Sequence, residues 1–348
     1  MGMPASSEER YDRQMRFSPF GPEGQKRLSR GFAVVVGMGA LGCVAAHHLV
    51  RAGIGRIRLI DRDIVTWSNL HRQSLYTEAD AEAGLPKAEA AAERLCAVNS
   101  RVVIEAAAIH LNPRNAEQLL ADADLIIDGT DHFSVRYLIN DAAVRYGIPW
   151  IYGGAVGSSG MTMTVVPGKT PCYRCLFPSP PPPGAADTCE TAGVLPPIVD
   201  VIGSLQAMEA IKLLAGRGEH LHGALIHADL WNLSFTKMKT AGARRDDCPC
   251  CGLRRFEYLD AAMGDASETV LCGRETVQIT PAGTVSLDLD ELAERLKAAG
   301  RVERNPWLLR LAPEDGISLA LFPDGRALVT GTGDPERARR IYERILSP

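Results

Sequence analysis

Two pairs of cysteines with CxxC spacing are the residues whose types and spacing most directly suggest chemistry in this 348-residue sequence. A two-residue spacer lets a tight turn direct both thiolates at one ion, and two such turns supply the four sulfur ligands of a structural zinc site. Because all four tetrahedral positions would be filled, no catalytic water could bind. The sequence therefore predicts a structural zinc site formed by Cys172, Cys175, Cys248 and Cys251.

Other interpretations of the cysteines stay open. Free cysteines often serve as small buried hydrophobic residues, although chance seldom places two CxxC pairs in one chain. Disulfide bonds are a further alternative, but the stretch MGMPASSEERYDRQ is polar and charged, unlike a signal peptide, and nine cysteines are an odd number. We therefore expect a cytoplasmic protein with reduced thiols. Cys250 and Cys272 lack a matching partner, so we expect them to be structural or incidental.

The composition argues against two classes of partner. Lys plus Arg total 38 and Asp plus Glu total 42, which gives a formal net charge of -4. Affinity for nucleic acid rests on clustered Lys and Arg that neutralise phosphates, so this charge balance does not favour a nucleic-acid partner. No apolar run approaches the length of about 18 residues that a membrane-spanning helix needs. We expect an ordinary soluble enzyme.

The first half of the chain alternates strand-like and helix-like segments. A continuous β-branched run at 32–37, a helical segment at 39–53 and a strand at 56–61 form one βαβ unit. The alternation predicts an α/β fold with a Rossmann-like, doubly wound and mainly parallel sheet, whose ligands bind at the carboxyl ends of the strands. It continues with helices at 85–99, 116–123 and 134–147 and with strands at 102–109, 124–131 and 148–156.

A segment rich in proline follows. Residues 172–202 contain clustered Pro and Gly and lack a period, so we expect an exposed, partly disordered loop whose mobile part covers about 177–200. A helix at 203–216 and two strands within 224–240 complete a first domain of residues 1–255.

Residues 256–348 have the pattern of a small separate α+β domain. The order is a strand, a helix, two strands joined by the turn PDG, and a closing helix with Asp334 as N-cap and Pro335 at its first position. We expect this domain to help dock a partner and to supply no catalytic group. Its expected core is Val277, Ile279, Leu292, Leu296, Leu309, Leu319, Phe322 and Ile341.

The segment GMGALG places three glycines between a strand and a helix. Gly37, Gly39 and Gly42 allow a tight turn and a close approach of the backbone to phosphate, while the helix N-terminus stabilises negative charge. Asp61, at the end of the next strand, is placed to hydrogen-bond a ribose hydroxyl. These features alone fit an NAD- or FAD-binding oxidoreductase as well as other nucleotide-binding proteins.

The residues after Asp61 favour ATP. Asn69, Arg72 and Gln73 follow in DRDIVTWSNLHRQSLY, and Lys87 begins the next helix. A dehydrogenase needs only backbone amides for its pyrophosphate, whereas cleavage between the α- and β-phosphates of ATP needs positive side chains for the developing charge. We expect these side chains on the surface of the cleft. Taken singly, Arg72 or Lys87 is more often a solvated surface charge.

Seven motifs in order resemble the ThiF/MoeB/HesA family of ubiquitin-like-protein activating enzymes, from about Arg10 to Leu253. Members of this family adenylate the C-terminal glycine of a small ubiquitin-like sulfur carrier such as MoaD or ThiS. The motifs are RYDRQ, GMGALG, DxDxVxxSNLxRQ, GxPKAEAA, DGTDHFSVRYLIND, the paired CxxC and TCETAGVLPPIVDVIGSLQAMEAIKLL.

The resemblance implies roles for individual residues. Asp131 would hold Mg²⁺ on the phosphates, and Arg13 would reach into the active site of the partner subunit of a homodimer. Two departures from the family's pattern are Ala40, at a loop position that is often Gly, and a slightly longer stretch from Asp61 to Lys87. Neither removes a charged group, so we expect activity to be retained. The implied ATP-site residues are Gly37, Gly39, Ala40, Gly42, Asp61, Asp63, Asn69, Arg72, Gln73, Lys87 and Asp131.

The expected chemistry suits these residue types. The carrier's carboxylate attacks the α-phosphorus of ATP, which gives an acyl-adenylate and pyrophosphate, and such a displacement depends on positioning and charge neutralisation. No general base is needed because the carboxylate is ionised at pH 7. We therefore assign no role to the eight histidines. His47 and His48 lie in a predicted helix and are expected to be packing or surface residues.

Cys189 has two interpretations of equal weight. In the family this TCxxAGV position carries a thiol that can form a thioester or acyl-disulfide with the activated carrier, and the alternative is a spectator thiol. No rhodanese-like module follows, so sulfur would come from a separate donor.

The sequence thus predicts an ATP-dependent adenylyltransferase for a ubiquitin-like sulfur carrier in molybdopterin, thiamine or thiolated-tRNA synthesis. The alternatives are a relative that adenylates another carboxylate or modifies tRNA, an oxidoreductase that binds NAD or FAD, and a carrier-binding scaffold without activity.

Overall fold

The structure is a computed structural model that describes residues 7–182, 191–261, 267–271, 275–281, 285–297, 299–312 and 316–346. The chain divides into two compact units, Met1–Ala261 and Ala262–Pro348. Cys189, Cys272 and part of the predicted mobile loop lie outside the described residues. Within the described part, no helix is both long and apolar enough to cross a membrane.

One eight-stranded sheet forms the centre of the first unit. Its strands are β1 (Phe32–Val36), β2 (Arg56–Ile60), β3 (Val103–Ala107), β4 (Leu125–Asp128), β5 (Trp150–Val156), β6 (Ser159–Val165), β7 (Ala224–Asp229) and β8 (Ser234–Lys239). Their order is β3-β2-β1-β4-β5-β6-β7-β8. The first five in this order are parallel, and β6, β7 and β8 continue the sheet antiparallel. The chain reverses its direction of growth between β1 and β4, which is where such sheets bind ligands.

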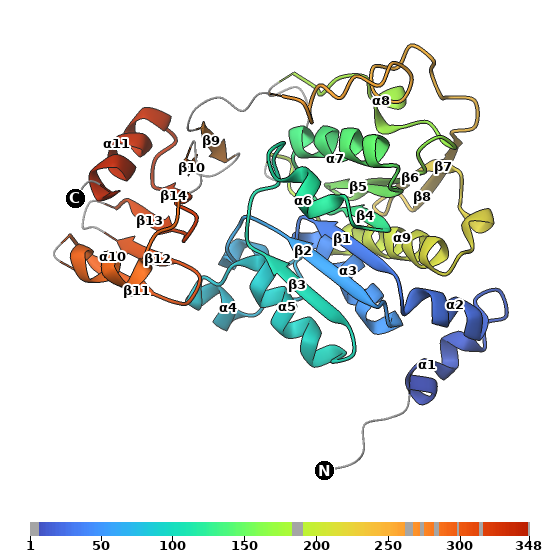
Figure 1. Ribbon diagram of the computed structural model, residues 1–348, viewed down its shortest axis with the longest axis horizontal. Coiled ribbons are helices and arrows are strands. Elements are labelled where there is room, and N and C mark those ends of the chain that lie inside the picture. The colour runs from blue at the N-terminus through green and yellow to red at the C-terminus, as the bar shows by residue number, and fades with distance from the viewer. Residues whose placement is uncertain are drawn as a thin grey trace. The chain divides into compact units, whose positions relative to one another are not determined.

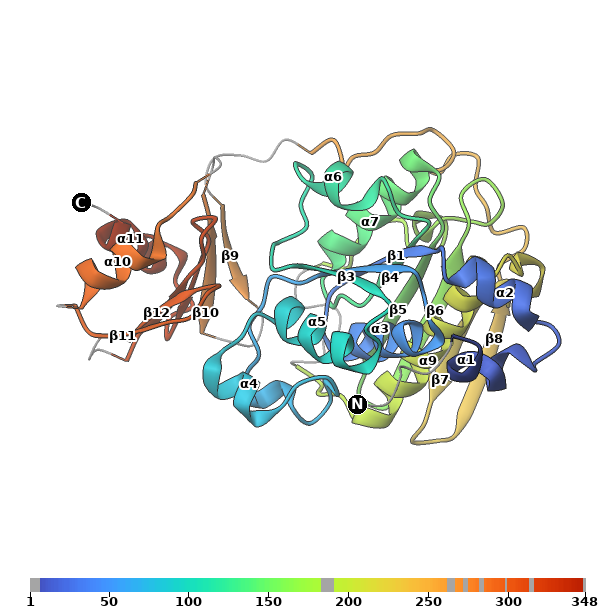
Figure 2. The same ribbon diagram turned by 60° about the horizontal axis from the view of Figure 1, so that its bottom comes forward.

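Helices cover both faces of this sheet (Figures 1 and 2). One face carries α3 (Ala40–Ala52), α5 (Lys87–Val98) and α9 (Pro196–Leu214), and the other carries α6 (Ala116–Leu120) and α7 (Phe133–Tyr146). Strand β1 is buried at every position. Because side chains alternate along a strand, Val34 and Val36 pack in one core cluster with α7, while Ala33 and Val35 pack in the other with α3. The predicted fold class is confirmed.

Shorter elements complete the first unit. They are α1 (Ser7–Met15), α2 (Gly21–Leu28), η1 (Trp67–Asn69), α4 (Glu78–Ala83), α8 (Tyr173–Leu176) and η2 (Gly218–His220).

The proline-rich segment contains more regular structure than its composition indicates. Residues 172–202 were expected to form a loop, but α8 lies within them and α9 begins at Pro196 rather than near residue 203. Pro196 and Pro197 occupy the first two helical positions, where the missing N–H groups would have no partner within the helix. Proline there starts a helix instead of breaking one, so the expected mobile loop cannot extend to residue 200.

The second unit is a six-stranded antiparallel sheet with two helices. Its elements are β9 (Ser267–Leu271), β10 (Thr276–Thr280), α10 (Leu289–Leu296), β11 (Arg301–Arg304), β12 (Leu309–Ala312), β13 (Ser318–Leu321), β14 (Ala327–Thr330) and α11 (Pro335–Leu346). The strand order is β11-β12-β13-β14-β10-β9. The three strands that the sequence predicted correspond to β10, β13 and β14, whereas β9, β11 and β12 were missed.

The predicted details of the second unit hold elsewhere. The PDG turn joins β13 to β14, with the Phe322 N–H donating to the Arg326 carbonyl at 2.8 Å. Asp334 caps α11, because its Oδ1 accepts from the Glu336 N–H at 2.9 Å. The predicted core residues are buried in one cluster, except that Phe322, also buried, has the Arg326 guanidinium 3.8 Å above its ring.

Candidate active site and cysteine cluster

The Gly-rich loop makes very close backbone contacts. Gly37 has φ +91°, and a Cβ there would lie 2.7 Å from the Gly129 carbonyl carbon. A Cβ on Gly42 would lie 1.9 Å from the Gly37 oxygen. Only glycine allows β1, α3 and the loop after β4 to meet this closely. Helix α3 begins after Gly39 with no side-chain cap, so its first N–H groups are open to an anion such as phosphate.

Asp61 supports this loop from the carboxyl end of β2. Its Oδ2 accepts from the Met38 N–H at 2.7 Å, and its Oδ1 accepts from the Asp63 N–H at 2.7 Å. Burial raises the pKa of Asp61 above its ordinary value. The carboxylate therefore fixes the shape of the Gly-rich loop, and each oxygen keeps one lone pair for a ligand such as a ribose hydroxyl.

Lys87 is held by an ion pair at the start of α5. Its Nζ lies 3.0 Å from Asp63 Oδ2, and its backbone N–H donates to the Asp63 carbonyl at 2.9 Å. The expectation that Lys87 lies on the cleft surface is wrong, because the residue is only 5% exposed. Burial alone would lower the pKa of Lys87, but the carboxylates of Asp63 and Asp61 outweigh it and raise that pKa. Lys87 and Arg62 likewise hold the pKa of Asp63 well below its usual range, against the effect of burial.

Asp131 lies in the loop after β4. Its side chain is 59% exposed, and its Oδ1 is 3.7 Å from His132 Nε2. Although desolvation of the carboxylate acts in the opposite direction, the nearby His132 and Lys87 lower the pKa of Asp131. The charge of Lys87 thus favours the ionised form of Asp131. An exposed ionised carboxylate beside a phosphate-binding loop is the type of ligand that Mg²⁺ takes together with substrate phosphates.

Two residues that the sequence analysis missed anchor this loop. Asp128 Oδ2 accepts from Arg136 Nε at 2.8 Å, and Arg136 also donates to the Thr130 carbonyl at 2.8 Å. Asp128 Oδ1 accepts from the Thr130 N–H at 2.9 Å. The sequence feature that could have revealed them is an aspartate at the end of an apolar strand, followed eight residues later by an arginine in a largely apolar helix. Charged side chains that are buried require partners of opposite charge.

The segment after Asp63 contributes buried amides. Asn69 Oδ1 accepts from the Thr66 N–H at 3.2 Å, whereas Asn69 Nδ2 and Gln73 Oε1 are buried without a partner among the described residues. Buried polar atoms without a partner are rare, so they suggest a ligand. Gln73 is adjacent to the Gly-rich loop, because its Nε2 lies 3.9 Å from where a Gly39 Cβ would be. Arg72, which is half-buried, donates from NH1 to the Ser68 carbonyl at 2.8 Å.

Arg62 and His132 also belong to this region, although the sequence analysis gave neither a role. Arg62 is buried, and its NH2 lies 2.6 Å from His132 Nε2. Burial and the charge of Arg62 lower the pKa of His132, although Asp131 acts in the opposite direction. The sequence could have indicated both residues, because Arg62 lies between the candidate carboxylates Asp61 and Asp63 and His132 directly follows Asp131.

One predicted catalytic residue, Arg13, does not lie in this region of its own chain. Arg13 is exposed on α1, and α1 is bound to the far end of α3 by the Gln14 side chain, which donates to the Ala52 carbonyl at 2.8 Å. Helix α3 has 13 residues, so this end lies about 20 Å from the Gly-rich loop. Arg13 therefore does not reach the Gly-rich loop of its own chain. Cys189 lies outside the described residues.

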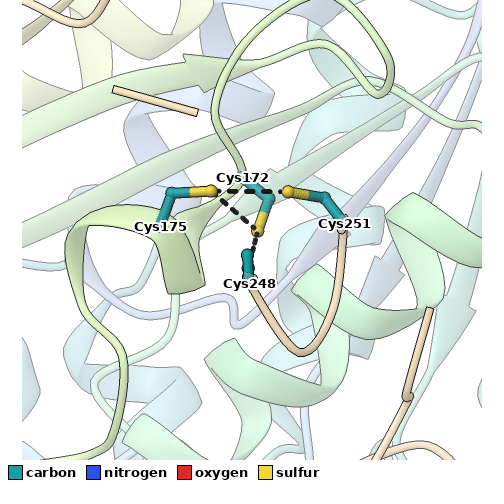
Figure 3. A group of neighbouring side chains, drawn as sticks. All are labelled: Cys172, Cys175, Cys248 and Cys251. Carbon is teal, nitrogen blue, oxygen red and sulfur yellow. Dashed lines mark hydrogen bonds between the residues drawn. The ribbon is translucent and has the colours of Figure 1, made fainter. Parts of the chain in front are cut away.

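The four predicted cysteines converge in the first unit (Figure 3). Their sulfur atoms all lie within 4.8 Å of one another. Cys172 Sγ is 3.9 Å from Cys175 Sγ and 3.6 Å from Cys248 Sγ. Cys175 Sγ is 3.4 Å from Cys251 Sγ. Zinc–sulfur bonds of about 2.3 Å in a tetrahedron place sulfurs about 3.8 Å apart, so the cluster has the dimensions of a zinc site.

Local turns position these thiols. The Cys175 N–H donates to the Cys172 carbonyl at 3.1 Å, and the Gly252 N–H donates to the Cys248 carbonyl at 3.0 Å. Cys250 is outside the cluster, because it points to α7, where its Sγ accepts from Asn140 Nδ2 at 3.2 Å. The predicted grouping of the four cysteines is confirmed.

Comparisons with known proteins agree with this arrangement. The ThiF family matches residues 11–250. The sulfur carrier protein ThiS adenylyltransferase of Bacillus subtilis is 45% identical over 336 residues, covering 96% of this chain and 98% of that protein. The sulfur carrier protein adenylyltransferase of Thermus thermophilus is 45% identical over 249 residues, covering 70% of this chain and 90% of that protein.

A solved structure has the same fold. The crystal structure of E. coli MccB with ATP has a TM-score of 0.60 and 27% sequence identity, and the match covers 70% of this chain and 74% of that one. The family resemblance predicted from the motifs is confirmed, and so is the enzyme class, adenylyltransferase. With about two thirds of its length matched, this chain belongs to the ThiF family.

Proposed function

We propose that this enzyme adenylates the C-terminal glycine of a ubiquitin-like sulfur carrier at the expense of ATP and releases pyrophosphate. The observation that carries the proposal is the Lys87–Asp63 pair, with a nitrogen–oxygen distance of 3.0 Å, held beside a Gly-rich loop and in electrostatic contact with Asp131. A dehydrogenase has no need for a buried lysine at this position. The names of the two sulfur-carrier relatives support the substrate class.

The reaction would use positioning rather than a protein base. The open N–H groups at the start of α3 bind phosphate oxygens. Lys87 and Arg72 stabilise negative charge as the bond between the α- and β-phosphates breaks. Asp131 would hold Mg²⁺, which would neutralise charge on the departing pyrophosphate. The amides of Asn69 and Gln73, with their unpartnered atoms, complete the ATP site.

The carrier is proposed to be ThiS-like and to serve thiamine synthesis. The relative from Bacillus subtilis is named for ThiS and covers nearly the whole chain, including the second unit. Carriers for molybdopterin or thiolated tRNA are the alternatives within the same reaction. A separate donor would supply the sulfur, and Cys189 would be the thiol on which a covalent carrier intermediate forms.

The working enzyme is proposed to be a homodimer. Arg13 is exposed on α1, about 20 Å from the Gly-rich loop of its own chain. In a dimer this guanidinium would enter the partner's site and contact the phosphates there.

The cysteine cluster is proposed to bind one structural zinc ion through Cys172, Cys175, Cys248 and Cys251. All four ligands are sulfur and three of them are buried, which leaves no position for substrate or water. The ion would join Cys172 and Cys175, which flank or lie in α8, to Cys248 and Cys251 near the end of the first unit.

Isotope exchange between pyrophosphate and ATP tests the proposal. Exchange should depend on a ThiS-type carrier and should vanish with a carrier that lacks its C-terminal glycine. If exchange instead requires a small carboxylate and no carrier, the substrate is that carboxylate and not a sulfur carrier. Absence of exchange with carriers of all three pathways would reject the adenylation reaction.

A further inference from the structure

Arg62 contacts the segments that follow β2, β3 and β4. It is 8% exposed and follows Asp61 directly after β2. Its NH2 is 2.6 Å from His132 Nε2, in the loop after β4. Its NH1 is 3.5 Å from His110 Nδ1, in the segment after β3. Its Nε is 3.8 Å from Asp63 Oδ1.

The contact with His132 fixes the form of that ring. A guanidinium can only donate hydrogen bonds, so His132 Nε2 must accept and carries no proton. The proton of the neutral ring is therefore on Nδ1. Nε2 then donates nothing to Asp131 Oδ1, which is 3.7 Å away.

The partners of Arg62 are themselves anchored. Asp63 is bound to Lys87 at 3.0 Å. The His110 carbonyl accepts from the Asn115 side chain at 2.9 Å. His132 is the residue directly before α7, whose Arg136 is bound to Asp128. Polar contacts thus lead from Lys87 through Asp63 and Arg62 to His132, and the backbone joins His132 directly to Asp131.

We propose that Arg62 and His132 form a brace that sets the distance between Lys87 and Asp131. Both are positioning residues and neither touches the nucleotide. The inference rests on the proposed function, in which Lys87 and the Asp131-bound cation act on the same triphosphate from two loops. A displacement of about 1 Å in such an arrangement can lower the rate on the order of a hundredfold. Substitution of a residue that positions a metal ligand typically lowers metal affinity by about 10- to 100-fold.

Four variants and three measurements test the brace. Arg62→Ala and His132→Phe remove it, and the double variant removes both sides. His132→Asn retains a hydrogen-bond acceptor. The measurements are affinity for ATP in EDTA, affinity for Mn²⁺ with a non-hydrolysable ATP analogue, and the Mg²⁺ concentration for half-maximal exchange.

The brace predicts a specific pattern. Affinity for ATP in EDTA should change less than about twofold, whereas Mn²⁺ affinity should fall about tenfold or more in both single variants. The double variant should be no worse than either single one, because both disrupt one contact. His132→Asn should recover most of the Mn²⁺ affinity.

A matched control is Arg58→Ala, which removes an arginine of β2 with ion pairs to Glu105 and Asp122 at 2.9 and 2.8 Å. It should alter thermal stability but not Mn²⁺ affinity.

Four results would overturn the brace. Additive losses in the double variant would show independent roles. A loss of ATP affinity in EDTA for Arg62→Ala alone would make Arg62 a direct nucleotide ligand. Equal Mn²⁺ affinity in all variants, with normal exchange in the wild type, would reject the brace and leave the proposed function intact. Absence of ATP binding in the wild type would reject both.

Discussion

The nucleotide region and the cysteine cluster hold their reactive groups in opposite ways. In the nucleotide region the buried charges compensate one another within the chain, as Lys87 does with Asp63 and Arg136 with Asp128. In the cysteine cluster four sulfurs face one another within 4.8 Å, and the proposed zinc ion would compensate the charge of their thiolates. The charges of the first region are thus paired without a ligand, whereas the second would depend on its metal for stability. Loss of ligand should therefore affect the two regions differently.

Removal of metal from the cysteine cluster should give the largest effect. The purified protein should contain about one zinc per chain, and Cys172→Ser should lose zinc and thermal stability together, because metal binding contributes directly to folding in such sites. Elemental analysis and thermal melting measure both. Cys96→Ser, at an exposed cysteine on α5, is the control and should retain zinc. Protein prepared without chelator that contains no zinc would contradict the assignment.

Replacement of Lys87 tests the charge compensation in the nucleotide region. Lys87→Met should lower adenylation by about a hundredfold or more. It should also destabilise the fold by about 3–5 kcal/mol, because it leaves the buried carboxylates of Asp61 and Asp63 without their main cation. The control Lys297→Met breaks an exposed pair with Glu294 and should cost no more than about 1 kcal/mol.

The destabilisation of the fold by Lys87→Met should increase with pH. In the wild type the pKa of Asp63 is lowered and that of Lys87 is raised, so the pair stabilises the fold from above the ordinary Asp pKa to below the ordinary Lys pKa. In Lys87→Met the carboxylate pKa values should rise above their unfolded values. Stability is then lost as pH rises through them, so the deficit should be larger at pH 8 than at pH 5 in thermal melts. An equal deficit at both pH values would show that the carboxylates are compensated by other groups.

The contrast between the two regions also explains what the sequence revealed. The CxxC pairs could be predicted because each turn is local in the sequence. The parallel strands could be predicted because their hydrophobic runs alternate with segments of helical periodicity. The burial of Lys87 could not be predicted from the sequence, because lysine is almost always exposed unless it is paired with an acidic side chain. The contact of Arg62 with His132 spans 70 positions and exists only because the strand order places β2 and β4 on either side of β1. The start of α9 was missed because proline was taken as a helix breaker.

Replacement of Arg72 should affect catalysis without affecting the fold. Arg72 is half-buried and bound through the Ser68 carbonyl, so it leaves no buried charge behind when removed. Arg72→Ala should lower carrier adenylation by about a hundredfold with an unchanged melting temperature. Arg94→Ala, which removes an arginine of α5 bound to Asp80 at 3.3 Å, is the matched control and should retain activity. Near-normal pyrophosphate exchange in Arg72→Ala would remove this residue from the site.

Removal of the second unit should have the smallest effect on the nucleotide chemistry. The described residues of Ala262–Pro348 have their own core, whereas Phe256 and Leu259 are buried in the core of the first unit. A chain that ends at Ala261 should therefore bind ATP and zinc as the full chain does. It should adenylate the carrier with a KM raised about tenfold, equivalent to about 1.4 kcal/mol of lost docking energy. A chain that ends at residue 255 is the control, and it should melt at a lower temperature because it lacks two buried side chains. If the chain that ends at Ala261 folds but binds no ATP, the second unit contributes to the nucleotide site. The nucleotide region would then not be complete within the first unit.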